Sequence, residues 1–481
     1  MKNTSKSIGT NYFFHTLYQV VTLITPLVTT PYISRVLLAE GVGQYSFYYT
    51  FVQYFVICGN LGFSTYGQIQ IARVRDDEKR RTQTFWEIFL VRLIVFGISS
   101  LVYLVFSAFS ENRVLMLILF GLMISGMADI SWLYFGMDDF KSVSLRNILV
   151  KAISIIGIFS FVKTKNDVWI YTAVLTYSTL FGSLVIWFGI NKIVSKPENK
   201  LNCLQHLKPA LTFFLPNIAT MIYTMTDKTM IGIITGSDAQ NGHYEQAHKI
   251  EQILVQFLLS IGVVYRSQMA RFFEIKDELK IRESTCKAMR IVLFASFPIC
   301  FGLISISRDL VGWFLGTDFL PSIPLLRIFS ILLIVISISN CMSNMYFIVT
   351  DKMNIFLLGT FSAAVINILC NLIMIPLWGA IGAALASVIS ELSMLIVFYF
   401  YSYEYFNIRL FYKSVINYTV ASLLMLGIIL AETRYLKPYV LSSVLIEIMT
   451  GVILYVLFLT IFRDKVFFDF IRIARERIKK L

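Results

Sequence analysis

Charged side chains stand inside several long apolar segments of this sequence. An ionisable group inside an apolar helix costs at least about 2.5–3.5 kcal/mol unless it faces a partner or a water-filled cavity, so each one is a candidate functional residue. The residues of this kind that we expect to face a cavity are Arg35, Asp129, Asp227, Lys228, Lys249, Arg327 and Glu391.

The cations in this set are suited to binding a phosphorylated group. Arginine matches phosphate oxygens with paired, charge-assisted hydrogen bonds, whereas lysine acts as a point charge. We therefore expect a substrate-binding cavity that uses Arg35, Lys228, Lys249 and Arg327. Tyr48, in a tyrosine-rich segment, can stack against a sugar face, although aromatic helix faces are more often packing surfaces.

The acids suggest a coupling ion. A desolvated carboxylate changes its protonation near neutral pH, so Asp129, Asp227 and Glu391 are candidates for binding a coupling proton or cation. Such coupling would draw on a proton gradient, a sodium gradient or the membrane potential. We expect no cofactor.

Some of these charges also have a local explanation. Glu245 and Lys249 are four residues apart, so they can form an ion pair within one helix. Asp227 and Lys228 are adjacent and point about 100° apart, so each needs another partner. Long cationic side chains near helix ends can extend to the membrane surface, and this is our interpretation of Arg92, Lys151, Lys287 and Arg290.

The elements that hold these residues are membrane-spanning helices. The chain is 57% hydrophobic and only 15% charged, with a mean hydropathy of +0.71, far more apolar than a soluble protein. Its apolar runs reach about 20 residues or more, enough to cross a bilayer, and lack the alternation of barrel strands. We predict an all-α polytopic membrane protein with about 14 transmembrane helices, near residues 8–36, 41–64, 85–108, 114–136, 148–162, 168–190, 209–236, 244–265, 285–306, 322–350, 355–377, 380–401, 412–431 and 440–462.

The formal charge of +13 reports orientation rather than a nucleic-acid partner, because Lys and Arg gather in alternate loops. Three basic loops, near residues 73–81, 192–200 and 266–282, are on the side of the N-terminus. With an even helix count, both termini are expected to be cytoplasmic. The tail is predicted to form an amphipathic helix on the inner leaflet, with Arg472, Arg475, Arg477, Lys479 and Lys480 among Phe467, Phe468, Phe470, Ile471 and Ile478.

The sequence carries an internal repeat of about 200 residues. Gly43-x-Tyr45 recurs as Gly242-x-Tyr244, and Gln-Ile-Ala-Arg at 70–73 recurs as Gln-Met-Ala-Arg at 268–271. Six predicted helices separate the copies, so the halves are expected to be parallel, pseudo-symmetric repeats. We predict six-helix bundles at 1–200 and 201–408, two appended helices at 409–462 and a basic cytoplasmic tail at 463–481.

Prolines support this repeat. Pro26 and Pro31 are expected to interrupt the first helix, and Pro209 and Pro216 lie in its counterpart, the seventh. Interrupted helices in corresponding halves are typical of the moving, substrate-lining elements of transporters.

Three stretches in order resemble the polysaccharide and O-antigen flippases of the multidrug, oligosaccharidyl-lipid and polysaccharide exporter superfamily. They are TPYISRVLLAEGVGQYSF at 30–47, IYTMTDKTMIGIITG at 222–236 with GHYEQAHKIEQ at 242–252, and WGAIGAALASVISE at 378–391. The resemblance implies two six-helix bundles around a central cavity lined by the first, second, seventh and eighth helices, working by alternating access. It implies a helix 13–14 groove for a lipid tail.

The resemblance also implies a substrate: undecaprenyl pyrophosphate carrying an oligosaccharide unit, moved to the outer leaflet of a bacterial cytoplasmic membrane for surface polysaccharide synthesis. Its partners would be membrane lipids and other polysaccharide-assembly membrane proteins. In such flippases, cations on the first, second and eighth helices hold the diphosphate. Arg35 and Lys249 match two of them, but the second-helix position corresponds to Tyr48 or its neighbours, so the cationic triad is incomplete.

Two other functions remain open at this point. A drug or organic-cation antiporter of the same superfamily would need an acidic, aromatic cavity rather than a cationic one. A membrane polysaccharide polymerase or glycosyltransferase would need a larger external loop or a catalytic domain. The sequence has no P-loop, H-E-x-x-H or G-x-S-x-G motif, which argues against nucleotide use and hydrolysis.

Overall fold

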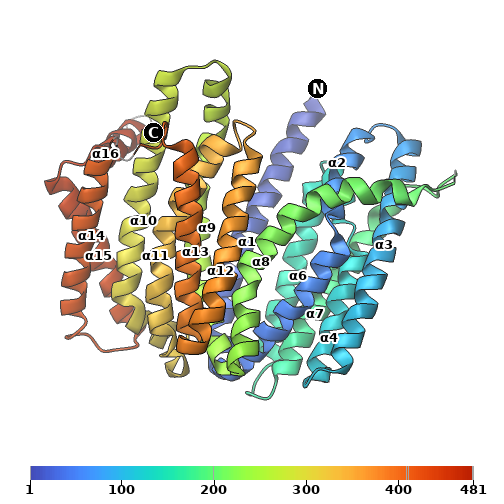
Figure 1. Cartoon of the computed structure of the whole chain (residues 1–481), viewed down its shortest axis with the longest axis horizontal. Helices are drawn as coiled ribbons and strands as arrows, with labels where there is room; N and C mark the ends of the chain where they lie inside the picture. Colours follow the sequence, from blue (N-terminus) through green and yellow to red (C-terminus); the bar gives the residue numbers. More distant parts are fainter. Residues whose placement is uncertain (1, 199, 408, 410, 479–481) are drawn as a thin grey trace. The chain divides into compact units, whose positions relative to one another are not determined.

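The computed structural model describes the backbone of residues 2–198, 200–407, 409 and 411–478, and every regular element in these ranges is helical (Figure 1). Short 3-10 turns lie at Ile186–Lys192, Cys203–His206 and Thr317–Phe319, and a π-helical turn lies at Ser343–Phe347. The α-helices are α1 (Lys2–Asn60), α2 (Phe63–Arg73), α3 (Glu78–Ala108), α4 (Arg113–Ala128), α5 (Ser131–Gly136), α6 (Phe140–Phe161), α7 (Val168–Val185), α8 (Leu207–Thr235), α9 (Asp238–Glu274), α10 (Glu278–Phe314), α11 (Ser322–Met342), α12 (Met353–Trp378), α13 (Ala380–Ser402), α14 (Tyr412–Glu432), α15 (Leu441–Ile461) and α16 (Lys465–Ile478).

Helices of membrane-crossing length and composition dominate the chain. Within the described residues, eleven helical stretches are long and apolar enough to cross a bilayer. One of these, Thr16–Arg73, is 58 residues long and contains a break in its backbone. The all-α polytopic fold class is confirmed, whereas the count of fourteen spans stays a prediction.

The break in the first long helical stretch lies at Leu38, where φ is 60° and ψ is −177°. This conformation ends one helix and starts another, so the predicted boundary between residues 36 and 41 is confirmed. The expectation that prolines interrupt this helix is wrong, because α1 continues through Pro26 and Pro31. A proline removes only one backbone hydrogen bond, and the hydrogen bonds of the neighbouring turns are enough to continue the helix here.

The chain forms two compact units, one ending at Thr229 and the other beginning at Met230. The division falls within α8. The predicted bundles at 1–200 and 201–408, with the appended helices and tail, stay predictions.

In the first unit, α1 packs against α3, α4, α6 and α7, and α4 packs against α7. A buried cluster that includes Phe63, Phe85 and Trp132 holds α2, α3 and α5 together. Gly67 allows this close packing, because a Cβ atom there would lie 2.5 Å from the Trp132 ring. The core of this unit is therefore closely packed around the break between α4 and α5.

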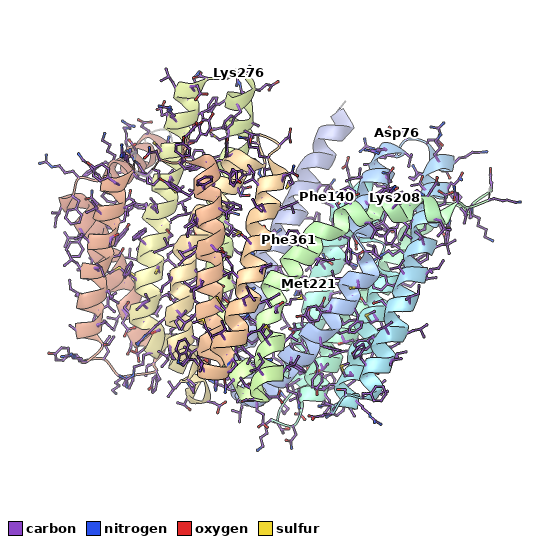
Figure 2. All side chains as sticks on the ribbon, viewed as in Figure 1. Asp76, Phe140, Lys208, Met221, Lys276 and Phe361 are labelled. Carbon is purple, nitrogen blue, oxygen red and sulfur yellow. The ribbon has the colours of Figure 1, made fainter. Side chains whose placement is uncertain are left out.

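In the second unit, α10 packs against α9, α11, α14 and α15, while α12 and α13 form a close pair. A Cβ atom on Gly382 would lie 2.1 Å from the carbonyl oxygen of Met374, so only glycine permits the tight α12–α13 turn. Figure 2 places Lys276 in the turn between α9 and α10, and Asp76 in the turn between α2 and α3. Both turns belong to the basic loops predicted to be cytoplasmic.

The tail forms a helix, α16, as predicted. Asp464 caps its first turn by accepting from the Phe467 N–H at 3.1 Å, and it also accepts from the Tyr418 hydroxyl of α14 at 3.2 Å. Lys479 and Lys480 lie outside the described residues, as do the side chains of Phe470, Arg475, Arg477 and Ile478.

Candidate functional site

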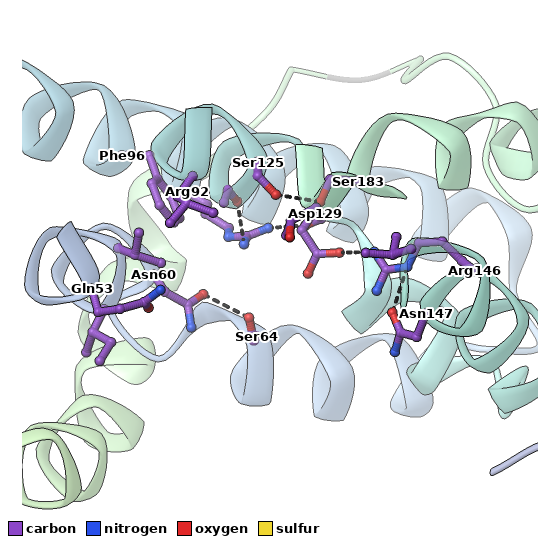
Figure 3. A pocket seen from close by; sticks show the side chains of 16 residues that line it. Gln53, Asn60, Ser64, Arg92, Phe96, Ser125, Asp129, Arg146, Asn147 and Ser183 are labelled. Atoms are coloured by element: carbon purple, nitrogen blue, oxygen red, sulfur yellow. Dashed lines mark hydrogen bonds and ion pairs between the residues drawn. The ribbon is translucent and has the colours of Figure 1, made fainter. Parts of the chain in front are cut away.

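A polar cavity of about 340 Å³ lies inside the first unit (Figure 3). Ligand pockets span about 300–1,000 Å³, so this cavity can take one small group rather than a whole lipid-linked oligosaccharide. Side chains from α1, α2, α3, α4, α6 and α7 line it, together with the residue between α4 and α5. The lining residues are Gln53, Val56, Ile57, Asn60, Ser64, Arg92, Phe96, Leu122, Ser125, Gly126, Asp129, Arg146, Asn147, Val150, Thr179 and Ser183.

Asp129 lies where α4 ends, in an extended conformation with φ of −72° and ψ of 115°. Its carboxylate accepts hydrogen bonds from the Ser131 hydroxyl and, at 3.0 Å, from the guanidinium of Arg146 on α6. The side chain of Arg146 is mostly buried, with 13% of its surface exposed. This partly buried ion pair therefore bridges the α4–α5 break to α6.

Arg92 approaches the same break from α3 and is 2% exposed. It donates to the carbonyl oxygens of Gly126, at 2.7 Å, and of Asp129, and it lies 5.2 Å from the centre of the Phe96 ring. The last carbonyls of a helix lack partners within it, so a buried arginine satisfies them here. The expectation that Arg92 extends to the membrane surface is wrong, because the helix break supplies acceptors inside the unit.

The cavity carries a net positive charge. Its lining holds two guanidinium groups, from Arg92 and Arg146, and one carboxylate, from Asp129, which leaves one excess positive charge. Neutral polar groups surround them, including a Ser125–Ser183 hydroxyl pair at 2.9 Å and an Asn60–Ser64 hydrogen bond at 2.8 Å. An anionic or neutral polar group fits this lining better than a cation does.

The coupling role expected for Asp129 stays a prediction. Its Oδ1 atom already contacts the Arg146 guanidinium, at 3.0 Å.

The other predicted site residues of the first unit lie outside this lining. Arg35 is exposed and donates to the Pro31 carbonyl at 3.1 Å. Tyr48 packs against a buried cluster that includes Val52 and Phe96, which fits the packing alternative. Asp227 is buried and Lys228 is half-buried in α8.

In the second unit, Lys249 forms the predicted ion pair with Glu245, at 3.4 Å. Arg327 is exposed and donates to the Ser307 hydroxyl at 2.9 Å. Glu391 is 2% exposed, and among the described residues no group hydrogen-bonds its Oε2 atom. A shared cavity formed by the predicted cations stays a prediction.

Sequence reasoning missed a second buried polar network in the first unit. The Nε2 atom of His206 lies 2.9 Å from a carboxylate oxygen of Glu87, and its Nδ1 atom lies 2.8 Å from the Tyr66 hydroxyl. The backbone N–H of Asn202 also donates to Glu87, at 2.9 Å. This network anchors the segment before α8 to α2 and α3. In the sequence, this network could have been suspected because one apolar helix carries two charged residues, Glu87 and Arg92.

A second cavity, of about 490 Å³, lies beside the Leu38 break and is lined in part by Glu40, Lys165 and Trp169. The neighbouring loop is held by Asp167, which accepts from the backbone N–H groups of Lys163 and Thr164. These two hydrogen bonds lower the pKa of the Asp167 carboxyl.

Comparison with known proteins agrees with this architecture. A "Putative O-antigen transporter" of Escherichia coli (strain K12) is 22% identical over 406 residues, covering 81% of this chain and 95% of the relative. A "Probable low-salt glycan biosynthesis flippase Agl15" of Haloferax volcanii is 22% identical over 291 residues, covering 58% of this chain and 60% of the relative.

Solved structures share the fold. The lipid II flippase MurJ in an inward closed conformation has a TM-score of 0.68 at 19% identity, covering 93% of this chain and 98% of that one. An inward-facing multidrug resistance MATE family transporter of the MOP superfamily has a TM-score of 0.59 at 15% identity, covering 80% and 93%. The fold of this integral membrane protein is therefore that of these transporters.

A family model adds the last comparison. Residues 8–265, more than half of the sequence, match the model described as polysaccharide biosynthesis protein. The resemblance noted in the sequence is thereby confirmed, and the chain belongs to the polysaccharide biosynthesis protein family.

Proposed function

We propose that this protein is a flippase that moves a polyprenyl-pyrophosphate-linked oligosaccharide from the cytoplasmic to the outer leaflet by alternating access. The observation that carries the proposal is membership of the polysaccharide biosynthesis protein family over residues 8–265. Relatives of similar length are named for O-antigen transport, and the fold matches a lipid II flippase over 93% of the chain. The expected cargo carrier is undecaprenyl pyrophosphate, and the product feeds surface polysaccharide synthesis.

The physical chemistry of the first unit supports an anionic or polar cargo. A buried arginine, a second arginine and one aspartate leave the Arg92–Asp129–Arg146 cavity with net positive charge. A pyrophosphate or an acidic sugar gains charge-assisted hydrogen bonds from such groups. The rival function, antiport of organic cations, would place a cation beside this excess positive charge, so the cavity favours the flippase.

A catalytic role is less consistent with these observations. The likeness to transporter folds extends over most of the chain. We therefore assign translocation rather than polymerisation or glycosyl transfer.

The remaining assignments follow from the proposed function. The protein would reside in a bacterial cytoplasmic membrane with both termini cytoplasmic, and it would work beside other polysaccharide-assembly membrane proteins. Transport would be driven by a proton gradient, a sodium gradient or the membrane potential through Asp129, Asp227 or Glu391. Arg35, Lys228, Lys249, Arg327 and Tyr48 would contact the lipid-linked oligosaccharide.

Deletion of the gene tests the proposed function. A deletion strain should accumulate one lipid-linked oligosaccharide, identified by mass spectrometry, on the cytoplasmic leaflet, and the intact gene should clear it. An unchanged pool of lipid-linked intermediates, together with increased sensitivity to organic cations, would instead support the antiporter.

A further inference from the structure

The cavity beside the Leu38 break has no part in the proposed function. It encloses about 490 Å³ within the first unit. Three segments build it: α1 just after the break, the loop between α3 and α4, and the loop between α6 and α7 with the first turn of α7. Its polar and aromatic lining residues are Glu40, Gln44, Asn112, Lys165, Asn166 and Trp169.

Most polar groups of this lining are not used by the protein itself. Within the part of the chain that the structure describes, no hydrogen bond or ion pair engages the side chains of Glu40, Gln44, Lys165 and Asn166. Asn112 accepts from the Leu115 N–H at 3.1 Å through its Oδ1 atom, and its amide N–H groups are still available. Water can satisfy such groups, and a ligand rich in hydroxyl groups can replace that water.

The walls of the cavity are held by packing and by hydrogen bonds. Asp167 accepts from the backbone N–H groups of residues 163 and 164, at 2.8 Å and 2.7 Å, which fixes the loop before α7. A Cβ atom on Gly41 would lie 2.9 Å from the Val168 side chain, so α1 and α7 approach closely here. Leu38 keeps φ of 60°, a strained conformation of the kind that gathers at functional sites. The lining is therefore formed before any ligand arrives.

Charge and polarity of the lining favour a neutral sugar. The Glu40 carboxylate and the Lys165 ammonium cancel, so this cavity lacks the excess charge that a pyrophosphate or an organic cation would need. Amide side chains both donate and accept, as sugar hydroxyls do. The Trp169 side chain is 53% exposed and offers a ring face whose negative potential attracts the C–H groups of a sugar ring. The volume is within the range of ligand pockets and suits a mono- or disaccharide.

The cavity lies at the end of the first unit opposite the basic loop at 73–81. The helix α3 begins after that loop and ends at Ala108, shortly before Asn112, and Figure 1 shows the α2–α3 turn and the start of α4 at opposite ends of this unit. With the basic loop cytoplasmic, as the proposed function has it, the cavity lies toward the outer side. A flippase delivers its oligosaccharide on that side.

We propose that this cavity is a saccharide-binding site, in which a neutral sugar ring stacks on Trp169 and hydrogen-bonds to Gln44, Asn112 and Asn166. Glu40 accepts from a hydroxyl group of the sugar. The binding of a sugar stands on the lining alone. Its use in receiving the translocated oligosaccharide rests on the proposed flippase function.

Binding of free sugars tests the site. The probes are mono- and disaccharides released by partial acid hydrolysis from the surface polysaccharide of the cells that carry the gene. Saturation-transfer NMR with the full-length protein in lipid nanodiscs should detect binding to the wild type. Trp169→Ala and Asn166→Ala should each bind several-fold more weakly. Trp378→Ala and Asn354→Ala are matched controls, because both residues are exposed at ends of α12, in the other unit, and these variants should bind like the wild type. Absence of binding to the wild type, or equal binding by all four variants, would overturn the proposal.

Oxidation of tryptophan in the wild type tests the site without any substitution. N-bromosuccinimide is applied with and without the same sugars, and the oxidised peptides are quantified by mass spectrometry. The sugars should protect Trp169 several-fold and leave Trp378 unprotected, and equal oxidation of Trp169 with and without sugar would contradict the site. Neither measurement involves transport. Sugar binding without accumulation of a lipid-linked oligosaccharide in the deletion strain would keep the site and refute the flippase, and accumulation without binding would do the reverse.

Discussion

The buried Arg92 should be the most costly charge to remove from the first unit. In Arg92→Met, the carbonyl oxygens of Gly126 and Asp129 lose their guanidinium donor while staying buried behind α3. Each orphaned acceptor costs about 1–3 kcal/mol, so two cost roughly 2–6 kcal/mol. Relief from burying the charge offsets part of this, and we expect a net loss of about 1–5 kcal/mol of unfolding free energy.

The assay is reversible denaturation of the purified protein in mixed micelles, followed by tryptophan fluorescence, to which Trp132 in the adjacent core contributes. Arg113 starts α4 and is exposed, so Arg113→Met removes the same kind of side chain without orphaning these carbonyls. Arg92→Lys keeps the charge but loses the two-pronged donor geometry, and its stability should fall between the two. A loss in Arg92→Met no larger than that in Arg113→Met would refute the assignment of Arg92 as the α4 C-terminal cap.

Other predictions follow from individual positions. Leu38→Gly should be about 1–3 kcal/mol more stable than Leu38→Ala, because only glycine adopts φ of 60° and ψ of −177° without strain; equal stabilities in denaturant would contradict this. Gly312→Ala should lose about 1–3 kcal/mol through overlap with the Tyr439 ring, and an unchanged melting temperature would argue against that packing. Glu87→Gln should weaken the contact between residue 87 and His206, so a protease should cleave the chain between residues 192 and 206 several-fold faster. Cleavage at the wild-type rate would disprove that this contact anchors the segment before α8. Combined neutralisation of Arg35 and Lys249 should abolish translocation while membrane insertion stays normal, with neutralisation of the exposed Lys196 as a control; wild-type translocation by the double variant would remove both from the site.

The helices could be predicted because their signal is local. A run of about 20 apolar residues has few alternatives in a bilayer, so a span could be predicted at residues 85–108, for example, and it lies within α3. The Glu245–Lys249 ion pair could be predicted equally well, because residues spaced four apart on one helix lie next to each other. Such features depend on a few neighbouring residues only.

The polar cavity depends instead on contacts between distant segments. Asp129 was recognised as a buried acid, but its partner Arg146 follows 17 residues later and lies on another helix. Arg92 was misjudged because the break between α4 and α5, which supplies its acceptors, leaves no mark in hydropathy. The prolines led to the opposite error, because an interruption was expected at Pro26 and Pro31 where there is none. The backbone of α1 leaves helical geometry at Leu38 instead.

The Glu87–His206 contact shows the same limit. These residues are 119 positions apart, and one lies on a span while the other lies in a polar connecting segment. Charge and hydropathy identify Glu87 and His206 as unusual polar residues, but they do not show that the two are in contact. Only the packing of α3 against the Cys203–His206 turn identifies them as partners.

Translocation in reconstituted vesicles tests the central claim most directly. Vesicles containing the purified protein and a labelled, pyrophosphate-linked oligosaccharide are probed with a membrane-impermeant enzyme that modifies only sugars on the exposed leaflet. The flippase assignment predicts that sugars from the inner leaflet become accessible only when the protein is present. Sugars that stay protected in vesicles whose protein exchanges organic cations would contradict it.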